Sequence, residues 1–161
     1  MRLQSTLEPF QLALRAAVAA GIALAIAELA ELQHPLFSAI AAVIATDLSP
    51  LQSRKLGSIR LVATVIGAVC GAALTPLLPS GPVAVGIAIL VTMLICTLTR
   101  AQDGARVAGY ICAIIVFEDS SAPWIYAWSR FVETALGVVV AWCISYVPKL
   151  ISTKKARENT N

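Results

Sequence analysis

Charged side chains are scarce in this sequence, and their scarcity excludes most soluble folds. Asp, Glu, Lys and Arg make up only 13% of the 161 residues, whereas hydrophobic residues make up 58% and the mean hydropathy is +0.82. No stretch outside the apolar runs is long enough for a second, aqueous domain. This balance predicts an integral membrane protein, with the lipid bilayer as its main partner.

The sequence also has little of what metal sites, enzymes and nucleic-acid interfaces need. It holds one histidine, no CxxC pair, and four cysteines spread over separate apolar runs. This pattern disfavours zinc and iron–sulfur sites and predicts packing cysteines that stay as thiols. There is no nucleophile–base pair, no phosphate-binding loop and no basic patch interleaved with aromatic residues, so we expect no enzyme activity, cofactor, metal or nucleic-acid partner. The cysteines are Cys70, Cys96, Cys112 and Cys143.

What the sequence does contain is a series of six apolar segments. Two of them are short for a membrane span, which takes roughly 20 residues. A short segment precedes the series and a basic tail follows it, and we predict both to be cytoplasmic. The composition predicts an all-α polytopic membrane domain over residues 10–148. The segments lie at about 10–32, 36–46, 56–78, 83–99 and 107–117, with a sixth that ends near Pro148; the flanking parts are 1–9 and 149–161.

The first apolar segment has a second interpretation. Arg2, the apolar core and the triplet Ala25-Ile26-Ala27 resemble the three regions of a secretory signal peptide. Glu8 and Arg15 make a poor n-region, so we favour a retained helix in which Arg15 snorkels to the interface.

A short pattern occurs twice in the chain. RLVATVIGAV at 60–69 and RFVETALGVV at 130–139 both read Arg-x-Val-x-Thr-x-x-Gly-x-Val, and every matched pair has the same separation as Arg60 and Arg130. The same offset carries the short segment 36–46 almost onto the short segment 107–117. Each half then holds three spans, and an odd number inverts the second half relative to the first. We predict six transmembrane helices as two inverted three-helix repeats, about 10–78 and 83–148, with the substrate site near the midplane.

The charged residues alternate between the connections. Lys and Arg lie at both termini and in the second and fourth connections, which places both termini in the cytoplasm if there are six spans. If the two short segments were re-entrant, Arg54 and Lys55 would face outside, so the charges favour six spans over four. Trp124, Tyr126 and Trp128 are typical of an aromatic interface belt. The other connections carry Glu28, Glu31, Glu118 and Asp119.

Arg60 and Arg130 open the two copies of the pattern and are the main candidate site residues. The inversion places Arg60 just inside the cytoplasmic face and Arg130 just inside the opposite one. An arginine within a span is costly unless it meets water, an acid or an anion, and its forked donors suit carboxylates. We therefore predict a polar pathway for organic anions, with the two arginines as its inner and outer charges. The alternative is that both side chains snorkel to the interface.

Three neighbours of these arginines are further candidates for substrate binding. Glu133 follows Arg130 by one turn and either neutralises it as an ion-pair partner or serves in proton coupling. Thr64 and Thr134 either face the pathway or bond the carbonyls of their own helices.

Together these residues resemble a known family. Pro35 to Val43 (PLFSAIAAV), Ser53, Arg60-x-x-Ala-Thr64-x-x-Gly67-x-x-x-Gly71 and Arg130-x-x-Glu133-Thr134-x-x-Gly137 resemble the membrane domain of the FUSC family. That family comprises fusaric acid resistance and aromatic acid exporter proteins and is similar to plant aluminium-activated malate transporters. The resemblance spans about 10–147. Ala63 stands where the family usually has glycine, and the large cytoplasmic domain common in the family is missing.

The resemblance implies a six-helix unit that forms a dimer or larger homo-oligomer and handles organic, often aromatic, carboxylates, with Arg60 and Arg130 facing the anion. Combined with the residues, it predicts an exporter or channel for small organic anions in a bacterial cytoplasmic (inner) membrane. One alternative is a non-transporting small subunit of a larger membrane complex, docked through small-residue faces. Another is an inorganic anion channel. The small-residue faces are Ala17/Gly21/Ala25 and Gly67/Gly71.

Overall fold

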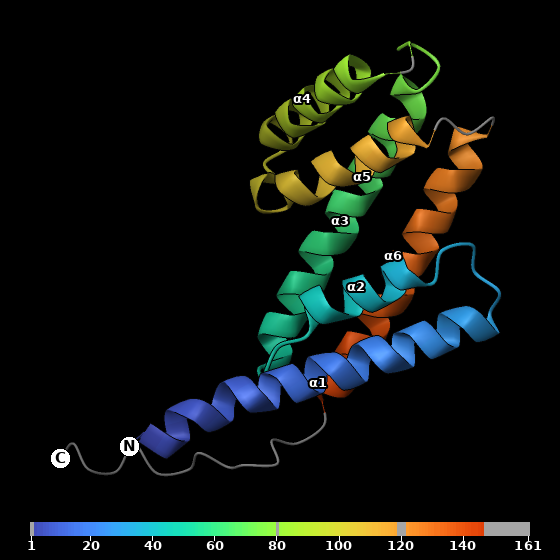
Figure 1. Cartoon of the computed structure of the whole chain (residues 1–161). Coiled ribbons are helices and arrows are strands. Elements are labelled where there is room, and N and C mark those ends of the chain that lie inside the picture. Colours follow the sequence, from blue (N-terminus) through green and yellow to red (C-terminus); the bar gives the residue numbers. More distant parts are fainter. Residues whose placement is uncertain (1, 80, 119–121, 147–161) are drawn as a thin grey trace.

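The computed structural model describes residues 2–79, 81–118 and 122–146, with side chains from Pro9 onward. The described residues form helices and no strands, as the sequence predicts (Figure 1). The two short helices occupy the positions expected from the two short apolar segments. The helices are α1 (Arg2–Leu29), α2 (Leu36–Ala45), α3 (Pro50–Leu74), α4 (Pro82–Leu98), α5 (Ala105–Phe117) and α6 (Pro123–Ser145), with a 3₁₀ turn, η1 (Gln102–Gly104), before α5.

Proline and left-handed residues mark several helix ends. α3, α4 and α6 each begin with proline, whose missing N–H has no helical partner at that position. Glu31 and Arg100, with φ values of 51° and 58°, turn the chain away after α1 and α4. α1 begins at Arg2 and contains Pro9, so most of the segment set apart as 1–9 is helical. The proline removes one backbone bond near the start of a 28-residue helix, which the remaining bonds tolerate.

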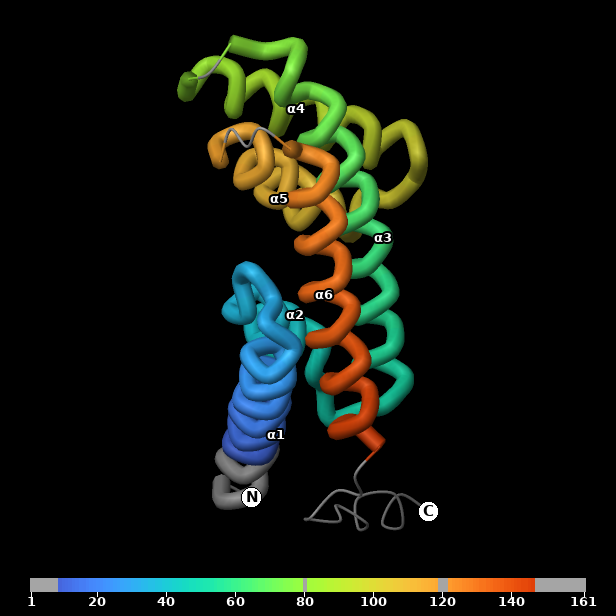
Figure 2. The backbone as a smooth tube through the Cα atoms, turned by 90° about the vertical axis from the view of Figure 1, so that its right-hand side faces the viewer, coloured from blue at the N-terminus to red at the C-terminus, as the bar shows by residue number. Residues whose placement is uncertain are grey.

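The most extensive contacts join helices from different halves of the chain. α3 and α6 run antiparallel and pack along each other at the centre (Figures 1 and 2). The short helix of each half packs mainly on the long helix of the other half, α2 on α6 and α5 on α3. α1 then covers α2 and α6, and α4 covers α5 and α3. Neither half, α1–α3 or α4–α6, is a self-contained bundle.

Glycines allow the exchanged helices to approach closely. A Cβ on Gly67 of α3 would lie 2.5 Å from the carbonyl oxygen of Ala108 in α5. A Cβ on Gly137 of α6 would collide with the carbonyl oxygen of Ser38 and lie 2.8 Å from the Cβ of Ala41, both in α2. Only glycine fits at these two positions without moving the neighbouring backbone.

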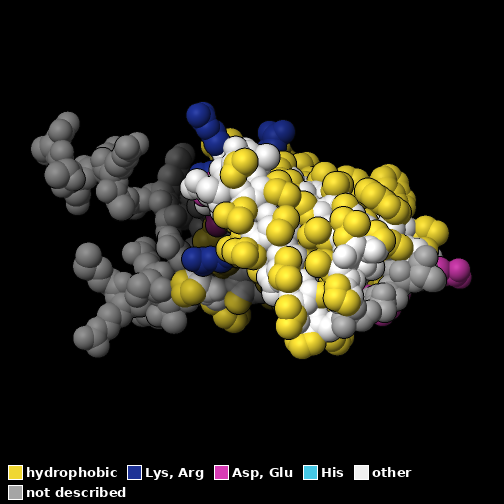
Figure 3. Space-filling model, turned by 90° about the horizontal axis from the view of Figure 1, so that it is seen from above, with side chains coloured by type: hydrophobic (Ala, Val, Ile, Leu, Met, Phe, Trp, Pro, Cys, Tyr) yellow, Lys and Arg dark blue, Asp and Glu magenta, His cyan; other side chains and the backbone are white. Residues whose placement is uncertain are grey.

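The exposed apolar surface and the three longest helices are those expected of an integral membrane protein. Three helices, Pro9–Leu29, Pro50–Leu74 and Pro123–Ser145, are long and apolar enough to cross a membrane. The apolar α2 and α4 are shorter, and α5 has 13 residues. Large apolar side chains are exposed on every helix, and Figure 3 shows them covering most of one face.

The ends of the helices lie on two sides of the molecule. In Figure 1 the start of α1 and the α2–α3 and α4–α5 connections lie to the left, whereas the α1–α2 connection, the end of α3 and the end of α5 lie to the right. Asp119 and the tail 149–161 lie outside the described residues. The left-hand ends and connections contain Arg54, Lys55, Arg100 and Arg106 as well as Asp47 and Asp103, and the right-hand ones contain Glu28, Glu31 and Glu118.

Candidate functional site

Arg130 lies near the start of α6, against aromatic side chains. It is 2% exposed, and its Nη2 donates a hydrogen bond of 2.9 Å to the hydroxyl oxygen of Tyr126. Its Cζ lies 3.6 Å from the ring centroid of Phe37 and 4.6 Å from that of Tyr126. The His34 ring contacts both aromatic rings edge-on. Because α2 packs on α6, residues from opposite halves of the sequence form one aromatic cluster around a cation.

Glu133 joins this cluster and is fully buried. One carboxylate oxygen lies 3.1 Å from Nη1 of Arg130, so the ion pair considered from the sequence is present. The other accepts a 2.9 Å hydrogen bond from the backbone N–H of His34, in the α1–α2 connection. Burial and the charge of Arg130 lower the pKa of His34 below its usual 6.5, against an opposing effect of Glu118. Glu133 therefore ties the α1–α2 connection to α6 as well as balancing Arg130.

Arg60 lies in α3 without any comparable acid. It is 2% exposed, and its Cζ lies 5.6 Å from the ring centroid of Tyr110 in α5. Among the described residues, its Nε and Nη1 have no hydrogen-bond partner and no carboxylate forms an ion pair with it. The buried hydroxyl of Tyr110 also has no partner in this part of the chain. Arg60 therefore holds a positive charge and unused donors inside the protein, and neither arginine has the exposed geometry of a snorkelling side chain.

The two threonines of the repeated pattern are buried beside the arginines. The Thr64 hydroxyl donates a 2.8 Å hydrogen bond to the carbonyl oxygen of Arg60 in its own helix, which is the structural alternative named above. Thr134 is 4% exposed at the matching position in α6. The proton of the Thr64 hydroxyl is therefore directed at the backbone of α3.

The sequence did not identify the aromatic partners of the arginines. Tyr126, expected in an interface belt, is 7% exposed, whereas Trp124 and Trp128 are 59% and 66% exposed. Its position four residues before Arg130 was a local signal that could have revealed the contact. Phe37 and Tyr110 come from other helices, so no local signal existed. Arg15, expected to snorkel, is 8% exposed within the fold, because it lies on the face of α1 that packs inward.

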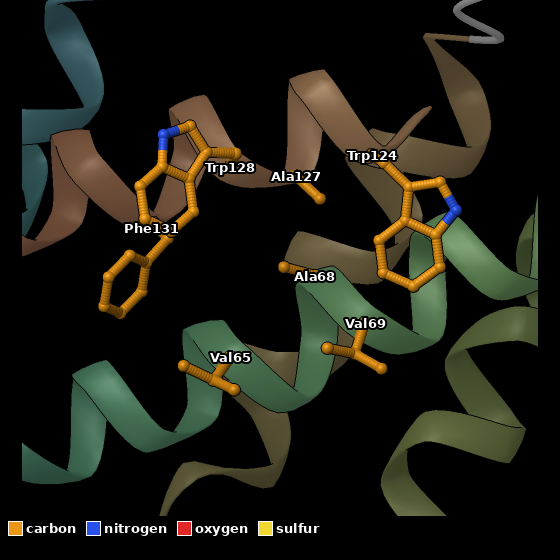
Figure 4. Close-up of a pocket in the computed structure, with 7 residues that line it drawn as sticks. All are labelled: Val65, Ala68, Val69, Trp124, Ala127, Trp128 and Phe131. Atoms are coloured by element: carbon orange, nitrogen blue, oxygen red, sulfur yellow. The ribbon is translucent and has the colours of Figure 1, made fainter. Parts of the chain in front are cut away.

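A separate groove runs between α3 and α6. It has a volume of about 290 Å³, and Figure 4 shows side chains from both helices lining it. Its lining contains no charged side chain, and neither Arg60 nor Arg130 contributes to it. The structure therefore does not combine this groove with either arginine. The lining residues are Val65, Ala68, Val69, Trp124, Ala127, Trp128 and Phe131.

The cysteines are four free thiols, of which Cys96 and Cys112 are buried in helix contacts. Within residues 2–79, 81–118 and 122–146, no group of three or more His, Cys, Asp or Glu side chains could hold a metal ion.

Comparison with protein families finds a match over most of the chain. A family model described as aromatic acid exporter family member 1 matches residues 10–147, which contain α2 to α6 and most of α1. No curated protein and no solved structure matches the chain.

Proposed function

This chain belongs to the aromatic acid exporter family, and we propose that it carries small organic carboxylate anions, aromatic ones among them, across a membrane as an exporter or channel. The observation that carries the proposal is Arg60. A buried guanidinium without a counter-ion is unfavourable in an apolar environment and is typical of a site that an anion or water occupies during function. Its free Nε and Nη1 donors can each give a charge-assisted hydrogen bond to an oxygen of an anion.

The second arginine extends this site into a pathway. Arg60 lies about 15 Å along α3 from Pro50, and Arg130 lies about 10 Å along α6 from Pro123. Because α3 and α6 are antiparallel, the two charges approach the middle of the molecule from opposite sides. An anion would meet Arg60 first from one side and Arg130 first from the other.

The proposal includes six spans arranged as two inverted repeats, and the exchanged packing supports it. The offset that relates Arg60 to Arg130 also relates Gly67 to Gly137 and Ser38 to Ala108. Gly67 meets Ala108, and Gly137 meets Ser38. A single rotation that swaps the halves would produce this reciprocal pair of contacts.

The charges at the helix ends support the orientation that the proposal includes. Among the described residues, the ends on one side carry Arg54, Lys55, Arg100 and Arg106 together with Asp47 and Asp103, whereas those on the other side carry acidic residues and no Lys or Arg. Because Lys and Arg decide orientation, this distribution supports the cytoplasmic termini that we propose for a protein of a bacterial inner membrane.

Efflux of benzoate from proteoliposomes tests the proposal. We expect flux above that of empty liposomes, and Arg60→Gln to lower it about tenfold or more because the variant removes the free charge. Arg54→Gln is the matched control, since it removes one charge from the exposed part of the same helix. Each variant is checked by size exclusion for an unchanged assembly. Absence of flux for benzoate and several other carboxylates would refute autonomous transport, and chloride flux without benzoate flux would indicate an inorganic anion channel.

A non-transporting subunit of a larger complex is the second candidate function. The exposed stripe Ala17/Gly21/Ala25 on α1 favours it, because nothing lies within 4 Å of a Cβ placed on Gly21. The other predicted docking face is not available, since Gly67 and Gly71 are buried against α5. The α1 stripe is equally suited to contact a second copy, as the proposed homo-oligomer requires. A stoichiometric partner that copurifies, together with no flux, would favour the subunit.

A further inference from the structure

The two arginine sites correspond in position but differ in one acid. The offset that carries Arg60 onto Arg130 also carries Ala63 onto Glu133 and His34 onto Gly104. Corresponding residues are neighbours in the fold: Glu133 accepts the N–H of His34, and the Cβ of Ala63 lies 2.7 Å from a Cβ placed on Gly104. An internal carboxylate is therefore present at one site, and an alanine takes its place at the other.

We propose that Glu133 is a built-in competitor at Arg130, and that an incoming aryl carboxylate binds there by replacing it and thereby releases the α1–α2 connection. This inference rests on the proposed function, because it requires that a carboxylate reaches Arg130. It assigns the two arginines different roles. Arg60 is an open site, and Arg130 is a site that the protein's own carboxylate keeps closed.

The ion pair leaves polar atoms of both side chains without a hydrogen bond. Nη1 of Arg130 and Oε2 of Glu133 are 3.1 Å apart, yet neither atom makes a hydrogen bond among the described residues. Nε of Arg130 is also without one in that part of the chain. In this pair the guanidinium and the carboxylate are close but are not aligned for a hydrogen bond. A free carboxylate, which is not held to the same helix, can accept the charge-assisted hydrogen bond from Nη1 that Glu133 does not accept.

The side chains around Arg130 favour binding of an aromatic acid over an aliphatic one. The rings of Phe37 and Tyr126 lie against the guanidinium, and the ring of His34 contacts both. A benzoate ring brought in with its carboxylate would meet these rings in edge or offset contacts.

Displacement of the Glu133 carboxylate by an anion would also affect a backbone hydrogen bond. The same side chain accepts the backbone N–H of His34, so moving it away from Arg130 breaks the bond that ties the α1–α2 connection to α6. Binding of the anion would therefore loosen this connection, on the side of the protein where α1 ends and α6 begins. Arg60 has no such link, because Ala63 has no polar side chain.

Two measurements on detergent-purified protein test the inference, with sodium benzoate as the probe. Glu133→Gln keeps an oxygen for the His34 amide but loses the competing charge, so we expect it to bind benzoate about tenfold more tightly than the wild type. Glu118→Gln, which removes a charge near His34 without touching Arg130, is expected to leave the affinity unchanged. In the wild type, benzoate should accelerate hydrogen exchange in a peptide covering the His34 amide. The Ser49 amide, bonded to Asp47 in another connection, should not respond.

The outcomes separate this inference from the proposed function. Suppose that benzoate flux is observed. If a folded Glu133→Gln then binds benzoate no more tightly than the wild type, or if hydrogen exchange at the His34 amide does not change, the inference is overturned and the transport proposal stands. If Glu133→Gln does not fold, the exchange measurement on the wild type decides alone. Absence of both benzoate flux and benzoate binding in the wild type overturns both proposals.

Discussion

Replacing Gly137 by alanine should destabilise the protein, although alanine is the better helix former. The added Cβ would collide with the carbonyl oxygen of Ser38 and lie 2.8 Å from the Cβ of Ala41 and 2.9 Å from the backbone N of Ala42. Two of these three atoms belong to backbone and the third is fixed to it, so α2 must move as a unit. Gly137→Ala therefore tests the close approach of α2 to α6.

The expected loss of folding free energy follows from two opposed effects. Overpacking a well-packed contact costs about 1–3 kcal/mol, and the rigid neighbours place this substitution near the upper end. The change from glycine to alanine within a helix returns about 1 kcal/mol. The net loss is about 2 kcal/mol for Gly137→Ala. It is about 1 kcal/mol for Gly67→Ala, where the nearest neighbours belong to Ala108 alone.

Thermal unfolding in detergent, monitored by intrinsic fluorescence, measures these effects. At about 2–4 °C per kcal/mol for a chain of this size, Gly137→Ala should lower Tm by about 4–8 °C. Gly86→Ala is the control, since nothing lies within 4 Å of a Cβ at that position, and it should leave Tm unchanged or raise it. If Gly137→Ala matched this control, the exchanged packing of α2 on α6 would be wrong.

Two further predictions concern single side chains. Burial and the charge of Arg130, opposed by Glu118, lower the pKa of His34, so the unfolded chain binds a proton where the folded protein does not. The stability present above pH 6.5 is therefore lost as the pH falls through the lowered pKa, and Tm measured between pH 8 and 5 should fall more in the wild type than in His34→Gln; equal slopes would contradict this. Trp142→Phe removes the 3.2 Å hydrogen bond from the indole to the carbonyl oxygen of Ser53 and should cost about 1 kcal/mol in chemical unfolding, whereas an unchanged midpoint would show that the bond contributes nothing.

The sequence was sufficient to predict the helical fold and the ion pair between Arg130 and Glu133. Long apolar runs and the repeated pattern around Arg60 and Arg130 are local features, and they predicted an all-helical membrane protein with two short helices at matching positions. Glu133 was identified as a partner of Arg130 because residues three apart on a helix are neighbours. Such inferences need only the geometry of one helix.

The rest of each arginine's environment could not be predicted where other helices supply it. Phe37 and Tyr110 reach Arg130 and Arg60 only through the packing of α2 on α6 and α5 on α3. Nothing in the local sequence specifies that exchange. The interface-belt interpretation of Tyr126 failed for the same reason, since the side of α6 on which α2 packs decides which aromatic residue is covered.

The exchange of short helices also bears on how the protein is made. α2 leaves the ribosome before its main partner exists, because roughly 80 further residues, or about 4–16 s of synthesis, separate Ala45 from Pro123. During that interval α1 is the principal helix that can shield it. A chain that stopped after α5 would lack α6 and would also leave α2 without its main support. A mutation or truncation that disrupts α6 would then also cause misassembly of α2 in the first half. Cellular quality control would detect damage to the second half through its effect on the first.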